Sequence, residues 1–262
     1  MTSQGLAREW PFLGTTVLVF MTSAVVTVYW CRSMSASMAM PGGWSMSMVW
    51  MRMPGQTSLG AAASFLAMWV VMMVAMMLPS FVPMLLRYRD SVHVPYEIRL
   101  AKLTTLVSAG YFFIWAIFGA MAYPFGLVST AAEIRWPAFA RSVPIVSGVV
   151  LLLAGCIQLT AWKARQLGRC QDVPTCGRSL PADARSAWQY GLGFGVRCTL
   201  CCLGFMTILL VIGVMNLVGM LMITSAITIE RLSPKPQSFA RAIGVGIIAV
   251  GALAIIRALG VT

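Results

Sequence analysis

Residues 63–86 read ASFLAMWVVMMVAMMLPSFVPMLL, an apolar run without an ionisable side chain. A bilayer's hydrocarbon core is about 30 Å thick, and a helix needs about 20 residues to cross it. This run is long enough, and a helix that is apolar on every side is typical of a buried or membrane-spanning position. We therefore expect a membrane-spanning helix here.

The rest of the chain has the same character, since 59% of its 262 residues are hydrophobic and only 10% are charged. This composition excludes an ordinary water-soluble globular fold. Further apolar spans are expected at about 11–30, 103–126, 143–162 and 239–259, with a long uncharged stretch at 198–229. The sequence predicts an all-α, polytopic transmembrane helical bundle that forms a single membrane domain over residues 1–262.

The uncharged stretch 198–229 decides the number of spans. As one helix it would extend about 48 Å, too long for one upright crossing and short for two crossings with a turn. Length favours six spans, with residues 191–202 as a short approach helix. Arg231, Lys235 and Arg241 in the next loop favour the cytoplasm and seven spans, so a seven-span bundle stays open.

Basic residues give the orientation, because loops rich in Lys and Arg stay cytoplasmic. Loop 87–102 and the Cys-containing loop 163–190 carry the most Lys and Arg, so both are expected inside, with the amino terminus. The loop 31–62 is then external. The net charge of +12 is spread between spans, which argues for a bilayer partner and against nucleic acid.

Methionine is unusually concentrated, since thirteen of the 20 methionines lie between positions 34 and 84. Seven are in the external loop 31–62, and the span that follows carries the candidate ligands Met68, Met72, Met73, Met76 and Met77. Met68, Met72 and Met76 stack on one helical face, which Met73 and Met77 widen. A thioether is a soft neutral donor that suits Cu(I). The alternative is that these side chains only fill an irregular interior.

Cysteine forms a second group. Cys198, Cys201 and Cys202 occupy i, i+3 and i+4, so their sulfurs share one face of a helix and are candidate ligands for Cu(I) or Zn(II). Arg197 is expected to favour their thiolate forms. Cys170, in the loop 163–190, is a candidate further ligand. The alternative is that small residues fill a tight helix contact.

Other polar residues point to no catalytic centre. Glu230 is expected at a membrane interface, paired with Arg231. The single histidine, His93, is too little for a haem or an oxygen-activating copper centre. We therefore assign no catalytic or cofactor-binding residue, and the sequence favours a role other than that of an enzyme.

Several pieces of the chain resemble a bacterial family of predicted metal-binding integral membrane proteins, a domain of unknown function. The matching pieces are MWVVMMVAMMLPS (68–80), the QLT…K…C stretch (158–170), Cys198-x-x-Cys201-Cys202, GVMN (213–216) with Met220, and Glu230-Arg231. The resemblance implies a bacterial inner-membrane location, with the cysteine triplet, Cys170 and the methionines of the second span as metal ligands. Leu200, Leu203 and Gly219 depart from the family pattern, which affects local packing.

Three functional hypotheses follow. The first is a membrane protein that handles or translocates Cu(I), with zinc as the alternative metal, through Met ligands outside and Cys ligands inside. The second is a subunit or assembly factor of a membrane-bound, copper-dependent oxidoreductase or monooxygenase, whose partners are other membrane subunits or a metallochaperone. The third is a purely structural protein, in which replacing Met68, Met72 and Met76 with Leu changes stability alone.

Overall fold

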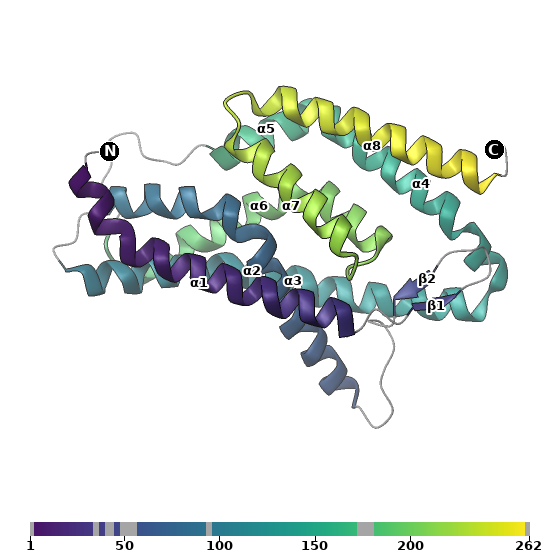
Figure 1. Cartoon of the computed structure of the whole chain (residues 1–262), viewed down its shortest axis with the longest axis horizontal. Helices are drawn as coiled ribbons and strands as arrows, with labels where there is room; N and C mark the ends of the chain where they lie inside the picture. Colours follow the sequence, from purple (N-terminus) through teal and green to yellow (C-terminus); the bar gives the residue numbers. More distant parts are fainter. Residues whose placement is uncertain are drawn as a thin grey trace.

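The computed structural model describes residues 3–33, 37–39, 45–47, 57–92, 96–171 and 181–259, which form a helical bundle (Figure 1). The helices are α1 (Ser3–Ser33), α2 (Ser58–Ser91), α3 (Glu97–Arg135), α4 (Pro137–Leu159), α5 (Ala161–Gln171), α6 (Ala184–Ile212), α7 (Leu217–Leu232) and α8 (Pro236–Ala258). Two short strands, β1 (Ser37–Ala39) and β2 (Ser45–Ser47), pair antiparallel. The predicted all-α architecture is confirmed.

Six of these helices, α1, α2, α3, α4, α6 and α8, are long and apolar enough to cross a membrane. Six such helices agree with the predicted number. The short approach helix at 191–202 is wrong, and because α7 brings the chain back to the end where α4 meets α5, the loop after α7 lies on the side where the seven-span alternative placed it. Residues 191–202 lie inside α6, because no helix-ending signal occurs before Gly213. The helix α7 has 16 residues, fewer than an upright crossing needs.

A four-residue turn separates α6 from α7. Gly213 has φ 111°, a backbone conformation that favours glycine, and it ends α6. Asn216 begins α7, and its side chain accepts a hydrogen bond from the Gly219 backbone N–H at 2.9 Å. The long uncharged stretch is therefore one long helix followed by a short return helix.

The helix α2 lies at the centre of the bundle. Trp69, Met73, Met77 and Phe81 are fully buried, at 0% exposure. Figure 1 shows that α2 changes direction along its length, and the helix contains Pro79 and Pro83. A proline inside a helix removes a backbone hydrogen bond and produces such bends.

Glycines allow α4 and α8 to pack closely. A Cβ on Gly148 would meet the Gly251 carbonyl at 3.1 Å, and one on Gly244 would meet the Gly155 carbonyl at 3.1 Å. Early residues of α4 thus pack on late residues of α8, so the two helices are antiparallel. The start of α8 consequently lies at the same end as the end of α4 and the start of α5.

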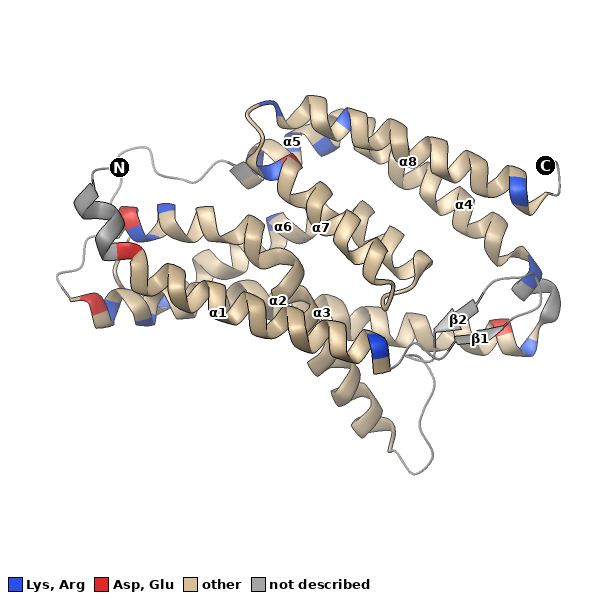
Figure 2. Cartoon of the chain, in the orientation of Figure 1, with Lys and Arg blue, Asp and Glu red and all other residues tan. Residues whose placement is uncertain are grey.

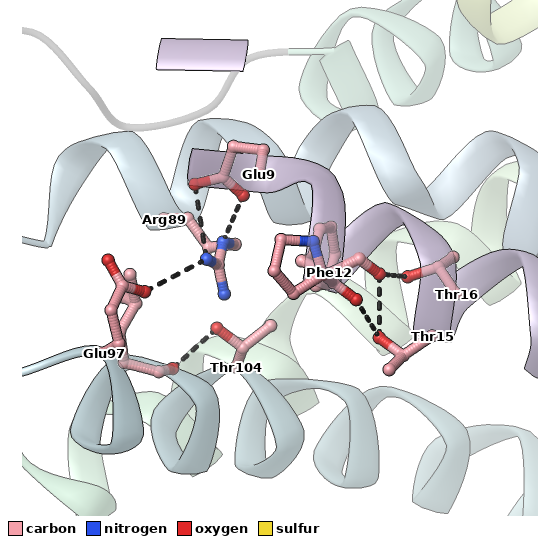
Figure 3. A network of polar contacts seen from close by, with 9 residues as sticks. Glu9, Phe12, Thr15, Thr16, Arg89, Glu97 and Thr104 are labelled. Carbon is pink, nitrogen blue, oxygen red and sulfur yellow. Dashed lines mark hydrogen bonds and ion pairs between the residues drawn. The ribbon is translucent and has the colours of Figure 1, made fainter. Parts of the chain in front are cut away.

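An ionic contact fastens α1 to the bundle (Figure 3). The Arg89 side chain on α2 donates to the Glu9 carboxylate with Nε–Oε2 at 2.7 Å, and both side chains are at most 10% exposed. The Arg89 guanidinium also lies 4.7 Å from the centre of the Phe12 ring. The rest of α1 presents many exposed apolar residues, as expected for a lipid-facing helix.

Charged residues lie mainly near the helix ends, and the helix interiors are nearly free of them (Figure 2). This distribution fits an apolar slab with polar boundaries. The exception that matters is a group of charges where α5, α7 and the start of α8 meet. Two of these, Lys163 and Glu230, are almost completely buried, at 1% and 2% exposure.

Candidate metal site

The three cysteines of α6 share one buried face, as their spacing predicts. Cys198, Cys201 and Cys202 are 0%, 3% and 1% exposed. The Cys202 side chain interacts with those of Cys198 and Cys201. Helix geometry alone places the sulfurs on one side, and the surrounding helices remove them from solvent.

Cys170 joins this group from α5. Its thiol donates a hydrogen bond to the Arg197 carbonyl at 3.2 Å, and its side chain also interacts with Cys201. The interaction with Cys201 and burial raise the pKa of Cys170, so this sulfur carries its proton at neutral pH in the metal-free protein. We call Cys170, Cys198, Cys201 and Cys202 the thiol cluster.

A tyrosine contacts the cluster from α3. The Tyr111 hydroxyl lies 2.9 Å from the Cys198 sulfur, and Tyr111 is fully buried against Phe81 at 4.1 Å between ring centroids. The aromatic stack holds the hydroxyl in place, because a ring packed on both sides has little rotational freedom. Tyr111 thereby fixes the position of Cys198.

Lys163 and Glu230 form a buried ion pair beside the cluster. The Lys163 Nζ is 3.0 Å from Glu230 Oε1, and it donates to the Cys201 carbonyl at 2.7 Å. It also lies 3.8 Å from the Cys201 sulfur. Burial lowers the pKa of Lys163, but Cys201 and Glu230 outweigh this and raise it, so the ammonium stays charged.

Arg231 connects the cluster to α2. Its Nη1 donates to the Ser80 hydroxyl at 3.3 Å, and its guanidinium lies 5.7 Å from the centre of the Phe194 ring. It interacts electrostatically with Cys198 and Cys202, among other groups. A buried cation therefore lies between α2 and the thiols of α6.

These contacts correct two expectations. Glu230 does not pair with Arg231 at an interface; it pairs with Lys163 in the interior, because consecutive residues of a helix point in different directions. Arg197 is exposed, and the cations that act on the thiols are Lys163 and Arg231. Sequence adjacency pointed to Arg197, whereas tertiary packing selected residues far along the chain.

All six methionines of α2 are buried, and the five that the sequence predicts as ligands have exposures between 0% and 6%. These five are Met68, Met72, Met73, Met76 and Met77, which we call the Met stripe. Ser80 and Phe81 follow the stripe directly in α2, and they contact Arg231 and Phe194. The end of α2 that follows the stripe and the thiol cluster of α5 and α6 are thus brought near the same guanidinium.

Sequence reasoning assigned no role at this site to Tyr111, Lys163, Ser80 or Arg231. A lysine and a glutamate next to apolar spans were the available signal, since buried ionisable groups in membrane proteins are costly and default to functional candidates. The partners themselves are far apart in sequence, for example 67 residues for Lys163 and Glu230. Only the folded chain shows which groups pair.

The donors present fit a soft monovalent ion. Within the described ranges, no group of three or more His, Cys, Asp or Glu side chains is arranged to hold a metal ion. Thiolates and thioethers are the ligands that Cu(I) prefers. The methionines of loop 31–62 and His93 lie outside the residues whose side chains the structure describes.

A surface hollow of about 360 Å³ opens next to the thiol cluster. It is lined by Gln166 and Arg169 of α5 and by Arg197 and Leu200 of α6. Arg169 and Leu200 are the chain neighbours of Cys170 and Cys201. The hollow therefore brings solvent and two cationic side chains close to the cluster.

The sequence was compared with known proteins. The family model described as PpoB2, a copper chaperone, matches residues 66–254. The chain belongs to this copper-chaperone family. The matched region runs from α2 into α8, so it includes every residue of the thiol cluster and the Met stripe. No curated protein and no solved structure matches the chain.

Proposed function

We propose that this protein is an integral membrane copper chaperone that binds Cu(I) as cargo through the thiol cluster and the Met stripe. In this proposal it resides in a bacterial inner membrane with its amino terminus in the cytoplasm. Family membership supports the copper assignment. The six long apolar helices support the membrane location.

One observation carries the proposal: four buried thiols from two helices gather beside two buried cations. Two thiolates on one Cu(I) ion carry a net charge of −1, which is costly in an apolar interior. The Lys163 ammonium, 3.8 Å from the Cys201 sulfur, and the Arg231 guanidinium offset that charge. A cluster that only filled space would need no cations, since neutral thiols pack as small hydrophobes.

The surrounding residues position the sulfurs. Tyr111 holds Cys198, and Lys163 holds the α6 backbone at Cys201. Cys170 sits on a separate helix at the edge of the cluster, next to the surface hollow. In the proposal it is the ligand that exchanges the ion with an acceptor, because at 7% exposure it is the least buried of the four thiols.

The Met stripe supplies neutral thioethers, which bind Cu(I) more weakly than thiolates and suit an ion in transit. The external loop 31–62 would deliver the ion to this stripe. Zinc as the cargo is the alternative metal. A role as a subunit or assembly factor of a copper-dependent oxidoreductase is compatible with a chaperone, and stable co-purification with other membrane subunits would favour it.

The test measures Cu(I) bound per detergent-purified protein, against a chromogenic Cu(I) chelator, under reducing conditions. Replacing Cys198, Cys201 and Cys202 together with Ser should remove the tightest bound ion. Replacing Met68, Met72 and Met76 with Leu should weaken binding without unfolding the protein, because Leu and Met have similar volume.

Matched controls are available on the same chain. Cys156 and Met121 are exposed, the latter at 62%, so Cys156→Ser and Met121→Leu should bind as wild type. Wild-type stoichiometry in the triple Ser variant would contradict the assignment of the thiol cluster. Unchanged affinity in the triple Leu variant would leave the Met stripe with a packing role only.

A further inference from the structure

A second pair of sulfur atoms lies apart from the thiol cluster. The Cys31 thiol donates to the Met215 thioether, with the two sulfurs 3.5 Å apart across 184 residues of sequence. Cys31 is 3% exposed in the last turns of α1, and Met215 is partly buried in the turn between α6 and α7. Two soft donors from different elements are thus already in contact.

The pair lies at the end of a row of sulfurs on α6. Cys198, Cys202 and Met206 follow each other at i, i+4 and i+8, so they share one face of the helix, and Met206 is fully buried. The α6 helix ends at Ile212, and Met215 follows in the turn after it. Soft donors therefore run from the thiol cluster toward the C-terminal end of α6.

The backbone around Met215 allows its sulfur to adjust. The turn is not hydrogen-bonded as a helix, and the methionine side chain has three rotatable bonds. Cys31 is held by α1, whose Glu9–Arg89 contact fixes the opposite part of that helix. A small movement of the thioether would open room for an ion between the two sulfurs.

We propose that Cys31 and Met215 form a second Cu(I) site, at the end of α6 away from Cys170, from which the ion passes to or from the thiol cluster by way of Met206. The inference rests on the proposed copper function. On binding, the Cys31 sulfur bonds to Cu(I) and its proton goes to the buffer, while Met215 donates a neutral lone pair. Copper stays monovalent, so no oxidant or reductant takes part.

The experiment uses the full chain with Cys198, Cys201 and Cys202 replaced by Ser, so that the second site is observed without the first. Residual Cu(I) per protein is measured against the chelator, and protection of Cys31 from a maleimide is followed by peptide mass spectrometry. The background should retain one chelator-resistant ion and protect Cys31. Met215→Leu and Cys31→Ser should each lose that ion, and Met222→Leu, at a residue 68% exposed on α7, should keep it.

Each result has a defined reading. The second site is overturned if copper does not change the labelling of Cys31, or if the residual copper survives Met215→Leu. The thiol-cluster assignment still stands in that case, provided that the triple Ser variant binds one ion fewer than the wild type. If the wild-type protein binds no Cu(I) at all, the proposed function and this inference both fail. Circular dichroism of each variant separates loss of a ligand from loss of the fold.

Discussion

At the scale of single residues, Lys163 is the least expected feature of the molecule. Its ammonium lies in an apolar bundle, and the Glu230 carboxylate, the Cys201 carbonyl and the Phe205 ring at 5.1 Å surround it. An isolated charge is costly in such surroundings, so Lys163 and Glu230 each need the other to stay ionised in the interior. A hydrophobic pair of similar volume would pack at lower cost, which indicates that the charges serve the thiols.

Breaking this pair should destabilise the protein strongly. Lys163→Met removes the cation and leaves Glu230 buried, with an expected loss of about 3–5 kcal/mol in the free energy of unfolding. The double change of Lys163→Met with Glu230→Leu should recover much of that loss. The measurement is thermal unfolding in detergent followed by tryptophan fluorescence.

The control is Arg165→Met, which removes an exposed cation two residues away on α5. It should unfold at the wild-type temperature. A Lys163→Met variant that unfolds together with this control would show that the ion pair does not stabilise the bundle.

At the scale of elements, one face of α6 carries both glycines and cysteines, since Gly191, Gly195, Cys198 and Cys202 recur at i, i+4, i+7 and i+11. The glycines let this face pack closely on α3, where a Cβ on Gly191 would collide with Val107 and a Cβ on Gly110 of α3 would lie 2.8 Å from the Trp188 carbonyl. Small residues let helices approach closely in membranes. This close packing with α3 is what brings Tyr111 to Cys198.

Alanine at Gly191 should therefore separate α3 from α6, whereas alanine at Gly193 should not. A Cβ at Gly191 would collide with the backbone of Val107, and nothing lies within 4 Å of one at Gly193. Gly191→Ala should lower both thermal stability and Cu(I) affinity. Gly193→Ala should be neutral or stabilising by up to about 1 kcal/mol, since Ala favours helix over Gly.

Equal stability of the two variants would count against the close α3–α6 packing. The comparison is sharp because the substitution is identical and the two positions are two residues apart in the same helix. Unfolding temperature and chelator competition, measured on the same samples, give both values.

At the scale of the whole molecule, the short helix α7 decides which ends of the chain lie together. It returns from the end of α6 to the level of α5, where Lys163 and Glu230 pair, and α8 then runs antiparallel to α4. The basic loop around Lys235 thereby reaches the same end as the Cys170 region. The short helix α7, with one face buried against α2, brings the chain back to the same end as the loop 163–190, as the count of basic residues in the loops favoured.

Topology can be tested with single cysteines at three exposed positions in a background without Cys31, Cys156, Cys170 and Cys176. Lys235→Cys and Arg165→Cys should react with a membrane-impermeant maleimide only after spheroplasts are permeabilised, because both positions lie at the same end of the bundle, the end that the proposed orientation places in the cytoplasm. Arg141→Cys, at the start of α4, should react in intact spheroplasts. Labelling of Lys235→Cys from outside would contradict the return made by α7.

The sequence by itself determined the helical class, the number of long apolar helices and the shared helical face of the Met stripe and of the cysteine triplet. The reason is that hydrophobicity and the 3.6-residue period are local properties, which any window of the chain displays. Local signals also contained the break at Gly213 and the Asn216 cap, although the length of the uncharged stretch led to a wrong approach helix at 191–202.

Only the tertiary structure decided which groups surround the thiols. The partner of Glu230, the contact of Tyr111 with Cys198 and the meeting of Cys31 with Met215 join residues between 67 and 184 positions apart. Such contacts depend on how whole helices pack, and that is set by glycine faces and the length of α7 together. The sequence pattern identifies the sulfur donors, whereas the packing of the helices determines which residues surround them.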